Sequence, residues 1–144
     1  MKIKYLKLSI LKPWMLSDIN RLLFQLSKIA RDKSKDDLKR IIGQSQMALM
    51  AAFDGEDALV GIAAIYFYET LIKKTGIIED VVVDEKYRGK GIGDVLMRAL
   101  IEKAKEEKAE FIELTSNSKR AAAIAMYKKH GFQKRGTNCF RLVL

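Results

Sequence analysis

A glycine-rich turn follows a run of β-branched residues in the middle of the chain. Val81, Val82 and Val83 favour an extended backbone, and the segment Arg88–Gly93 (Arg-Gly-Lys-Gly-Ile-Gly) then opens a long helical pattern. Glycines let the backbone turn sharply and approach a ligand closely. The first N–H groups of a helix are unpaired and lie at the positive end of its dipole. This stretch therefore predicts a site for an anion such as a phosphate group.

The glycine spacing excludes two common phosphate-binding motifs. No Gly-Lys-Ser/Thr follows the first glycine at the P-loop distance, and glycines at every second residue do not match G-x-G-x-x-G. The segment fits Arg/Gln-x-x-Gly-x-Gly/Ala instead. A second constellation follows downstream, where Asn117 precedes Ala122 by five residues and Tyr127 precedes the pair Gly131-Phe132 by four.

These two motifs, in this order, resemble those of the GNAT superfamily of N-acetyltransferases. The resemblance covers residues 76–133 well, and the N-terminal half only by the order of its elements. It implies that acetyl-CoA is the cosubstrate and that a primary amine attacks it directly in a ternary complex. It also implies that the strand at Val81–Val83 separates from its parallel neighbour at 110–115, which frees backbone groups for the coenzyme and the acetyl carbonyl. The implied coenzyme-binding residues are Val81, Val82, Val83, Arg88, Gly89, Lys90, Gly91, Ile92, Gly93 and Asn117.

Two residues are the candidate catalytic groups. Tyr127, inside the second motif, is the candidate acid, because a phenol with a pKa of about 10 can protonate a thiolate whose thiol has a pKa of about 8.5. Glu79 is the candidate base, since an amine with a pKa of about 10 must first lose a proton. Strand alternation predicts that Asp80 points away from Glu79. Asp80, or water alone, stays open as the base.

The surrounding pattern predicts an α/β (α+β) fold with a mixed, mostly antiparallel sheet of about seven strands flanked by four helices. The fourth and fifth strands are expected to form the splayed parallel pair. We expect a single N-acetyltransferase domain over residues 1–144. The expected elements are a first strand over 5–10, helices over 18–30 (N-cap Ser17), 34–43, 91–108 and 119–130, strands over 47–53, 58–68, 76–83 and 111–114, a hairpin turn at 54–57, and a last strand pair from Phe132 to Leu144.

Composition restricts the function classes. The chain has 144 residues, 49% of them hydrophobic, which suits one globular domain. One cysteine and one histidine leave neither a disulfide framework nor a zinc cluster, so we expect no metal and a reducing cytoplasm. No apolar run is long enough to span a bilayer, so we expect no membrane partner.

The net charge of +9 fits either a solvated lysine-rich surface or an anionic partner. Because the lysines are spread along the whole chain, we expect no nucleic-acid partner. Lys90, Lys119, Arg120 and Lys129 are candidates to meet coenzyme phosphates, whereas His130 is expected to be exposed and Cys139 to serve packing.

Several alternatives stay open at this stage. A non-catalytic acyl-CoA sensor would use the same pocket without turnover, and a protein amino group could replace a small-molecule acceptor. Dimers are frequent in the superfamily, so a homodimer is also open.

Overall fold

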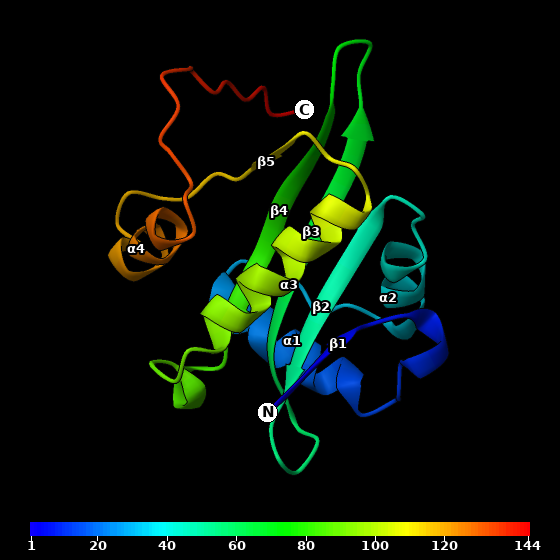
Figure 1. Ribbon diagram of the computed structural model, residues 1–144. Coiled ribbons are helices and arrows are strands. Elements are labelled where there is room, and N and C mark those ends of the chain that lie inside the picture. The colour runs from blue at the N-terminus through cyan, green and yellow to red at the C-terminus, as the bar shows by residue number, and fades with distance from the viewer.

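A five-stranded sheet with the order β1-β2-β3-β4-β5 forms the centre of the computed structural model (Figure 1). The strands are β1 (Lys2–Tyr5), β2 (Met47–Phe53), β3 (Leu59–Glu69), β4 (Lys74–Val83) and β5 (Phe111–Glu113). Neighbouring strands run antiparallel, except that β4 and β5 are parallel. The structure describes the backbone of residues 1–144 and every side chain except that of Leu8.

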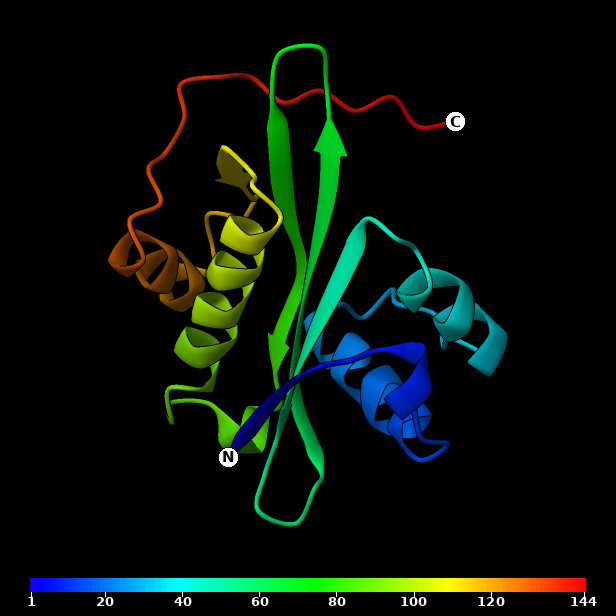
Figure 2. The same cartoon turned by 45° about the vertical axis from the view of Figure 1, so that its right-hand side comes forward.

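Helices cover both faces of the sheet. The helices α1 (Met15–Leu26) and α2 (Lys35–Ile42) lie on one face, and α3 (Ile92–Glu106) and α4 (Ala121–Lys129) lie on the other (Figure 2). Two short 3-10 helices, η1 (Leu8–Ile10) and η2 (Glu85–Tyr87), precede α1 and α3. The parallel pairing of β4 with β5 requires a crossover connection, and α3 supplies it.

Each face of the sheet has its own apolar core, because successive strand residues point to opposite faces. On the α1/α2 face, Ile62 of β3 belongs to a buried cluster with Leu22 of α1. On the other face, Ile65 of β3 belongs to a cluster with Leu96 and Leu100 of α3. The two helix layers are thus fixed independently to one sheet.

Most predicted elements are confirmed, including the hairpin between β2 and β3 and the capping box at the start of α2, where Ser34 and Asp37 bond each other's backbone N–H groups. The N-terminal boundaries were predicted wrongly. The first strand ends at Tyr5 instead of beginning there, and α1 begins at Met15, so Ser17 is not its N-cap. The Ser17 hydroxyl lies inside the first turn and donates to the Trp14 carbonyl, a competing local bond open to serine.

The predicted last strand pair is absent from the described backbone, so the sheet has five strands instead of about seven. Residues 133–144 form neither helix nor strand, and the side chains of Phe140 and Leu144 are exposed. Alternating apolar residues favour a strand, but a strand also needs an edge to pair with. With three residues, β5 offers a short edge.

Candidate active site

The pairing between β4 and β5 stops shortly after it begins. Only Thr75–Ile77 of β4 is paired with β5, whereas β4 continues to Val83 in pairing with β3. In the described sheet, the outer edge of β4 from Ile78 onward therefore has no strand beside it. Backbone N–H and C=O groups on this edge require other partners, and an extended ligand with amide groups can supply them.

A β-bulge interrupts β4 within this separated segment. The register shift leaves Ala63 of β3 alone opposite both Asp80 and Val81. Asp80 has a φ of 53°, in the left-handed region that a residue other than glycine rarely adopts. An extra residue of this kind bends a strand and redirects its side chains.

The bulge places Glu79 and Asp80 on the same face of the sheet, so the prediction that they point apart is wrong. Glu79 is paired with Ala64, which belongs to the core on the α1/α2 face. Asp80 lines a cavity on that face together with Ala64 and Tyr66. Strand alternation fails here because the bulge adds one residue to the repeat.

Asp80 perturbs the pKa of Glu79, and both carboxylates perturb a nearby phenol. Partial burial raises the pKa of Glu79, and the charge of Asp80 raises it further. The Asp80 side chain is exposed overall, but partial desolvation of its carboxylate still raises its pKa, whereas the neighbouring Lys33 lowers it. The pKa of Tyr66 is raised by burial and by both carboxylates. Carboxylates with raised pKa values are better proton acceptors than ordinary ones, which suits a base.

The glycine-rich turn leads from β4 through η2 into α3. Gly89 and Gly91 have φ values of 75° and 77°, and a Cβ built on either would have no neighbour within 4 Å. Gly91 is the N-cap residue of α3. The turn therefore requires glycine for its conformation and leaves open space beside the first N–H groups of α3, as an anion-binding turn should.

Gly93 serves a different purpose from the other two glycines. It lies inside α3, and a Cβ there would come within 2.9 Å of the Met126 sulfur of α4. Its missing side chain thus permits close packing of α3 against α4. Sequence spacing alone did not distinguish this packing role from an approach to the ligand.

The side chains of the turn shape the turn itself. The Arg88 Nε donates to the Val83 carbonyl at 3.0 Å. The Lys90 ammonium lies 5.0 Å from the centre of the Tyr87 ring, whose hydroxyl donates to Asp54 at 2.7 Å. These contacts hold the turn against the β2–β3 hairpin.

Tyr127 lies on α4, half-buried against the α3 core. Its ring meets Phe132 edge-on, with 6.1 Å between ring centres. Burial raises the pKa of Tyr127, and Arg120 opposes this shift. The phenol therefore holds its proton at neutral pH, as an acid must before it donates.

Asn117 and Arg120 shape the segment that leads into α4. The Asn117 side-chain oxygen accepts a hydrogen bond from the Lys119 N–H at 2.9 Å, which forms a turn. The Arg120 guanidinium donates to the Leu26 carbonyl at the end of α1, at 3.2 Å. Since α1 and α4 lie on opposite faces of the sheet, this bond joins the two helix layers.

Asp94 is a site residue that sequence reasoning missed. It lies in the first turn of α3 and accepts hydrogen bonds from Lys129 and pairs with His130, each at 2.9 Å. The prediction that His130 is exposed is wrong, because its side chain is only 11% exposed. An acidic residue is common in a first helical turn, so nothing in the sequence marked Asp94 as the link to α4.

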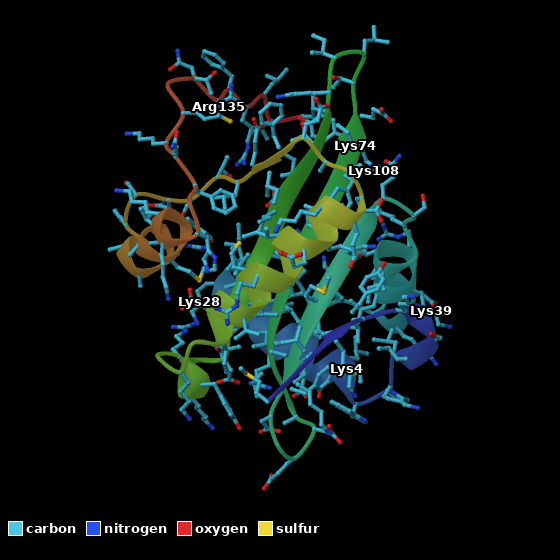
Figure 3. The ribbon with its side chains drawn as sticks, viewed as in Figure 1. Lys4, Lys28, Lys39, Lys74, Lys108 and Arg135 are labelled. Atoms are coloured by element: carbon cyan, nitrogen blue, oxygen red, sulfur yellow. The ribbon has the colours of Figure 1, made fainter. Side chains whose placement is uncertain are left out.

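Basic residues occur along the whole chain. Figure 3 labels six cations on separate elements around the molecule: Lys4, Lys28, Lys39, Lys74, Lys108 and Arg135. Among the described residues, no group of three or more acidic, histidine or cysteine side chains is arranged to hold a metal ion. Over the same residues, none of the helices combines the length and apolar character that crossing a bilayer requires.

The Asp94 link should stabilise the docking of α4. Its two partners lower the pKa of Asp94, so the ionised carboxylate contributes stability above its unfolded pKa of about 3.9, and this contribution is lost as the pH falls through the lower folded pKa. Asp94→Asn should therefore lower the free energy of unfolding by about 1 kcal/mol near neutral pH, and by progressively less as the pH falls through the lowered folded pKa. Urea unfolding at several pH values measures this difference. Asp32→Asn, an exposed position outside the ion pairs of the described side chains, is the control. Equal losses for Asp94→Asn at all pH values would contradict the account.

Comparison with known proteins agrees with this geometry. Residues 15–132 match the model of the acetyltransferase (GNAT) family. A streptothricin acetyltransferase of Streptomyces lavendulae is 39% identical over 79 residues, which cover 55% of this chain and 40% of that protein. The matched segments span only 26% to 40% of the curated relatives' length.

Solved structures match over nearly the whole chain. An acetyltransferase of Trypanosoma brucei has a TM-score of 0.79 and 26% identity, with 99% of each chain covered. The glucosamine-6-phosphate N-acetyltransferase of Arabidopsis thaliana has a TM-score of 0.80 at 20% identity, covering 98% of this chain and 97% of that one, which supports the fold alone. The glycine-rich turn beside a separated parallel strand pair, together with the family match over 118 residues (15 through 132), shows that the chain belongs to the acetyltransferase (GNAT) family.

Proposed function

We propose that the chain is an acetyl-CoA-dependent N-acetyltransferase that acetylates a small-molecule primary amine by direct attack in a ternary complex. One observation carries the proposal: the separated edge of β4 runs directly into the glycine turn that caps α3. An elongated molecule with amides along its arm and a diphosphate at its end is complementary to that continuous surface.

Acetyl-CoA fits the residues present. The open space beside Gly89 and Gly91 would receive the diphosphate, held by N–H groups from Arg88 to Gly93. The unpaired edge at Val81–Val83 would hold the pantetheine arm, and Asn117 would bond the coenzyme near the start of α4. Acetyl-CoA supplies the thioester whose acetyl carbon the amine attacks.

The chain's own residues would move two protons. An ammonium substrate and acetyl-CoA give an acetylated amine, coenzyme A thiol and one released proton. Glu79, or Asp80 in its place, would accept the ammonium proton, directly or through water, and pass it to solvent. The C–N bond then forms as the C–S bond breaks, and Tyr127 would give its proton to the departing sulfur and recover one from the amine.

The comparisons support a small acceptor without identifying it. One similar protein, 39% identical over 79 residues, is named for a small substrate, streptothricin. We further propose that residues 1–144 act as one acetyltransferase domain in the cytoplasm, independent of nucleic acid and membranes and without a metal. The spread of basic residues along the whole sequence supports independence of nucleic acid, because its binding needs a concentrated basic face.

Two other functions would use the same surface. A sensor that binds acyl-CoA without turnover would need no proton acceptor, whereas the raised pKa of Glu79 suits that role. A protein amino group could also be acetylated. A homodimer is compatible with either function, and neither the sensor nor the protein acceptor is favoured by a specific contact.

Coenzyme binding should depend on the left-handed conformation of Gly91. Gly91→Ala places a Cβ at a φ of 77°, which costs about 1–2 kcal/mol and distorts the turn. We expect the dissociation constant for acetyl-CoA to rise about tenfold, measured by calorimetric titration. Gly55→Ala is the control, because Gly55 has neither a positive φ nor a neighbour within 4 Å of its Cβ. Unchanged binding by Gly91→Ala would refute the assigned turn.

Turnover should depend on the Tyr127 hydroxyl. Tyr127→Phe removes the proton donor while keeping the ring that packs on Phe132. We expect kcat, measured by thiol release, to fall about 100-fold. The affinity for acetyl-CoA, measured by calorimetry, should change little. Tyr68→Phe, on the exposed end of β3, is the matched control. A kcat within twofold of wild type would exclude Tyr127 as the acid.

The activities and pH profiles of two variants should show which of the two neighbouring carboxylates is the base. If Glu79 is the base, Glu79→Gln should lower kcat/KM about 100-fold. Asp80→Asn should keep most activity and move the acid limb of the profile to lower pH, because the Asp80 charge raises the pKa of Glu79. The base must be ionised, so a lower pKa extends activity towards acid. The opposite pattern would assign the base to Asp80, and retained activity in both variants would leave water as the acceptor.

A further inference from the structure

A cavity of about 340 Å³ opens on the α1/α2 face of the sheet beside the separated part of β4. Its walls come from α1, α2 and the connection between them, and from strands β2, β3 and β4. Figure 2 shows α1 and α2 together on this side of the sheet. Ile19, Leu38 and Ile42 are among its buried apolar lining residues. Since a water molecule occupies about 30 Å³, the cavity suits a group of about a dozen non-hydrogen atoms.

The charged lining residues lie towards the exposed side of the cavity. Arg31 and Asp80 are exposed and Lys33 is half-buried, whereas the apolar lining residues named above are buried. Arg31, Lys33 and Asp80 form no ion pair with any of the described side chains. Two cations and one anion at the mouth of the cavity are thus available to a ligand whose apolar part enters the cavity.

Lys33 is held in place through its backbone. The Asn20 side chain of α1 accepts a hydrogen bond from the Lys33 N–H at 2.8 Å and donates one to the Lys33 carbonyl at 3.0 Å. Two bonds from one amide side chain fix this point of the α1–α2 connection. Lys33 also lies close enough to lower the pKa of Asp80. Lys33, with its backbone fixed, and Asp80 therefore line the same cavity.

From this arrangement we propose that the acceptor is an apolar α-amino acid or a close analogue, with its amine beside Asp80 and Glu79, its acidic group at Lys33 and Arg31, and its side chain in the cavity. The assignment rests on the proposed function and refines its substrate class. A polyamine would bring only positive charge to the two cations, which repel it. An amino sugar would bring several hydroxyl groups to a mostly apolar wall, on which Gln44 and Tyr66 are the uncharged side chains able to hydrogen-bond them.

Matched amines that differ only in the carboxylate test the assignment. We would measure thiol release from acetyl-CoA with L-phenylalanine and 2-phenylethylamine, and with L-leucine and 3-methylbutylamine, with spermidine as the polyamine. The expected kcat/KM is at least about tenfold higher for each amino acid than for its decarboxylated partner, because the carboxylate gains a charge-assisted hydrogen bond. Lys33→Met should reduce the ratio to about one by lowering the rate for the amino acid. The control Lys35→Met, an exposed residue outside the cavity lining, should preserve the ratio.

Rates that favour the decarboxylated amines, spermidine or a peptide N-terminus would overturn the substrate class while leaving the acetyltransferase activity intact. A ratio that Lys33→Met leaves unchanged would overturn it too. If no amine is acetylated, calorimetric titration of L-phenylalanine into the protein loaded with coenzyme A separates the two claims. Binding that Lys33→Met abolishes would support the ligand class and reject the activity, and absence of binding would overturn both.

Discussion

The separation of β4 from β5 after Ile77 is the constraint on which the rest of the structure depends. Backbone N–H and C=O groups that lack partners at a strand edge inside a protein cost free energy. Here β4 stays firmly paired with β3 on one side, and its free edge ends in the glycine turn and the start of α3. The open edge and the positive helix end thus form one surface, which a long ligand with amides and phosphates can satisfy.

The helix layers on the two faces complete this surface. On one face, α4 is held against α3 by the contact of Gly93 with Met126 and by Asp94, which binds the adjacent Lys129 and His130. These contacts position Tyr127 near the turn. On the other face, α1 and α2 form the cavity that reaches Asp80. Arg120 connects the layers by donating to the end of α1, so both reactants would meet between two mutually fixed walls.

The sequence predicted the features that local chemistry determines. Three valines, two glycines with positive φ and an amphipathic helix are each specified within a few residues, so the strand, turn and helix were found. The Asp80 bulge was not predicted, because nothing in the segment Ile78–Val83 shows where its pairing with β3 shifts register. The roles of Gly93 and Asp94 also escaped notice, since both depend on α4, more than 25 residues later in the chain. The last strand pair failed because alternation predicts a face but not a partner.

The most direct measurement of the central claim is the hydrogen exchange of individual backbone amides by NMR, with and without acetyl-CoA. Amides on the free edge of β4 at Val81–Val83 and in the turn at Arg88–Gly93 should exchange readily in the free protein and become protected on binding. Amides of β2, already paired on both sides, should hardly change. Protection elsewhere in the molecule, with the β4 edge and the turn unchanged, would contradict the account.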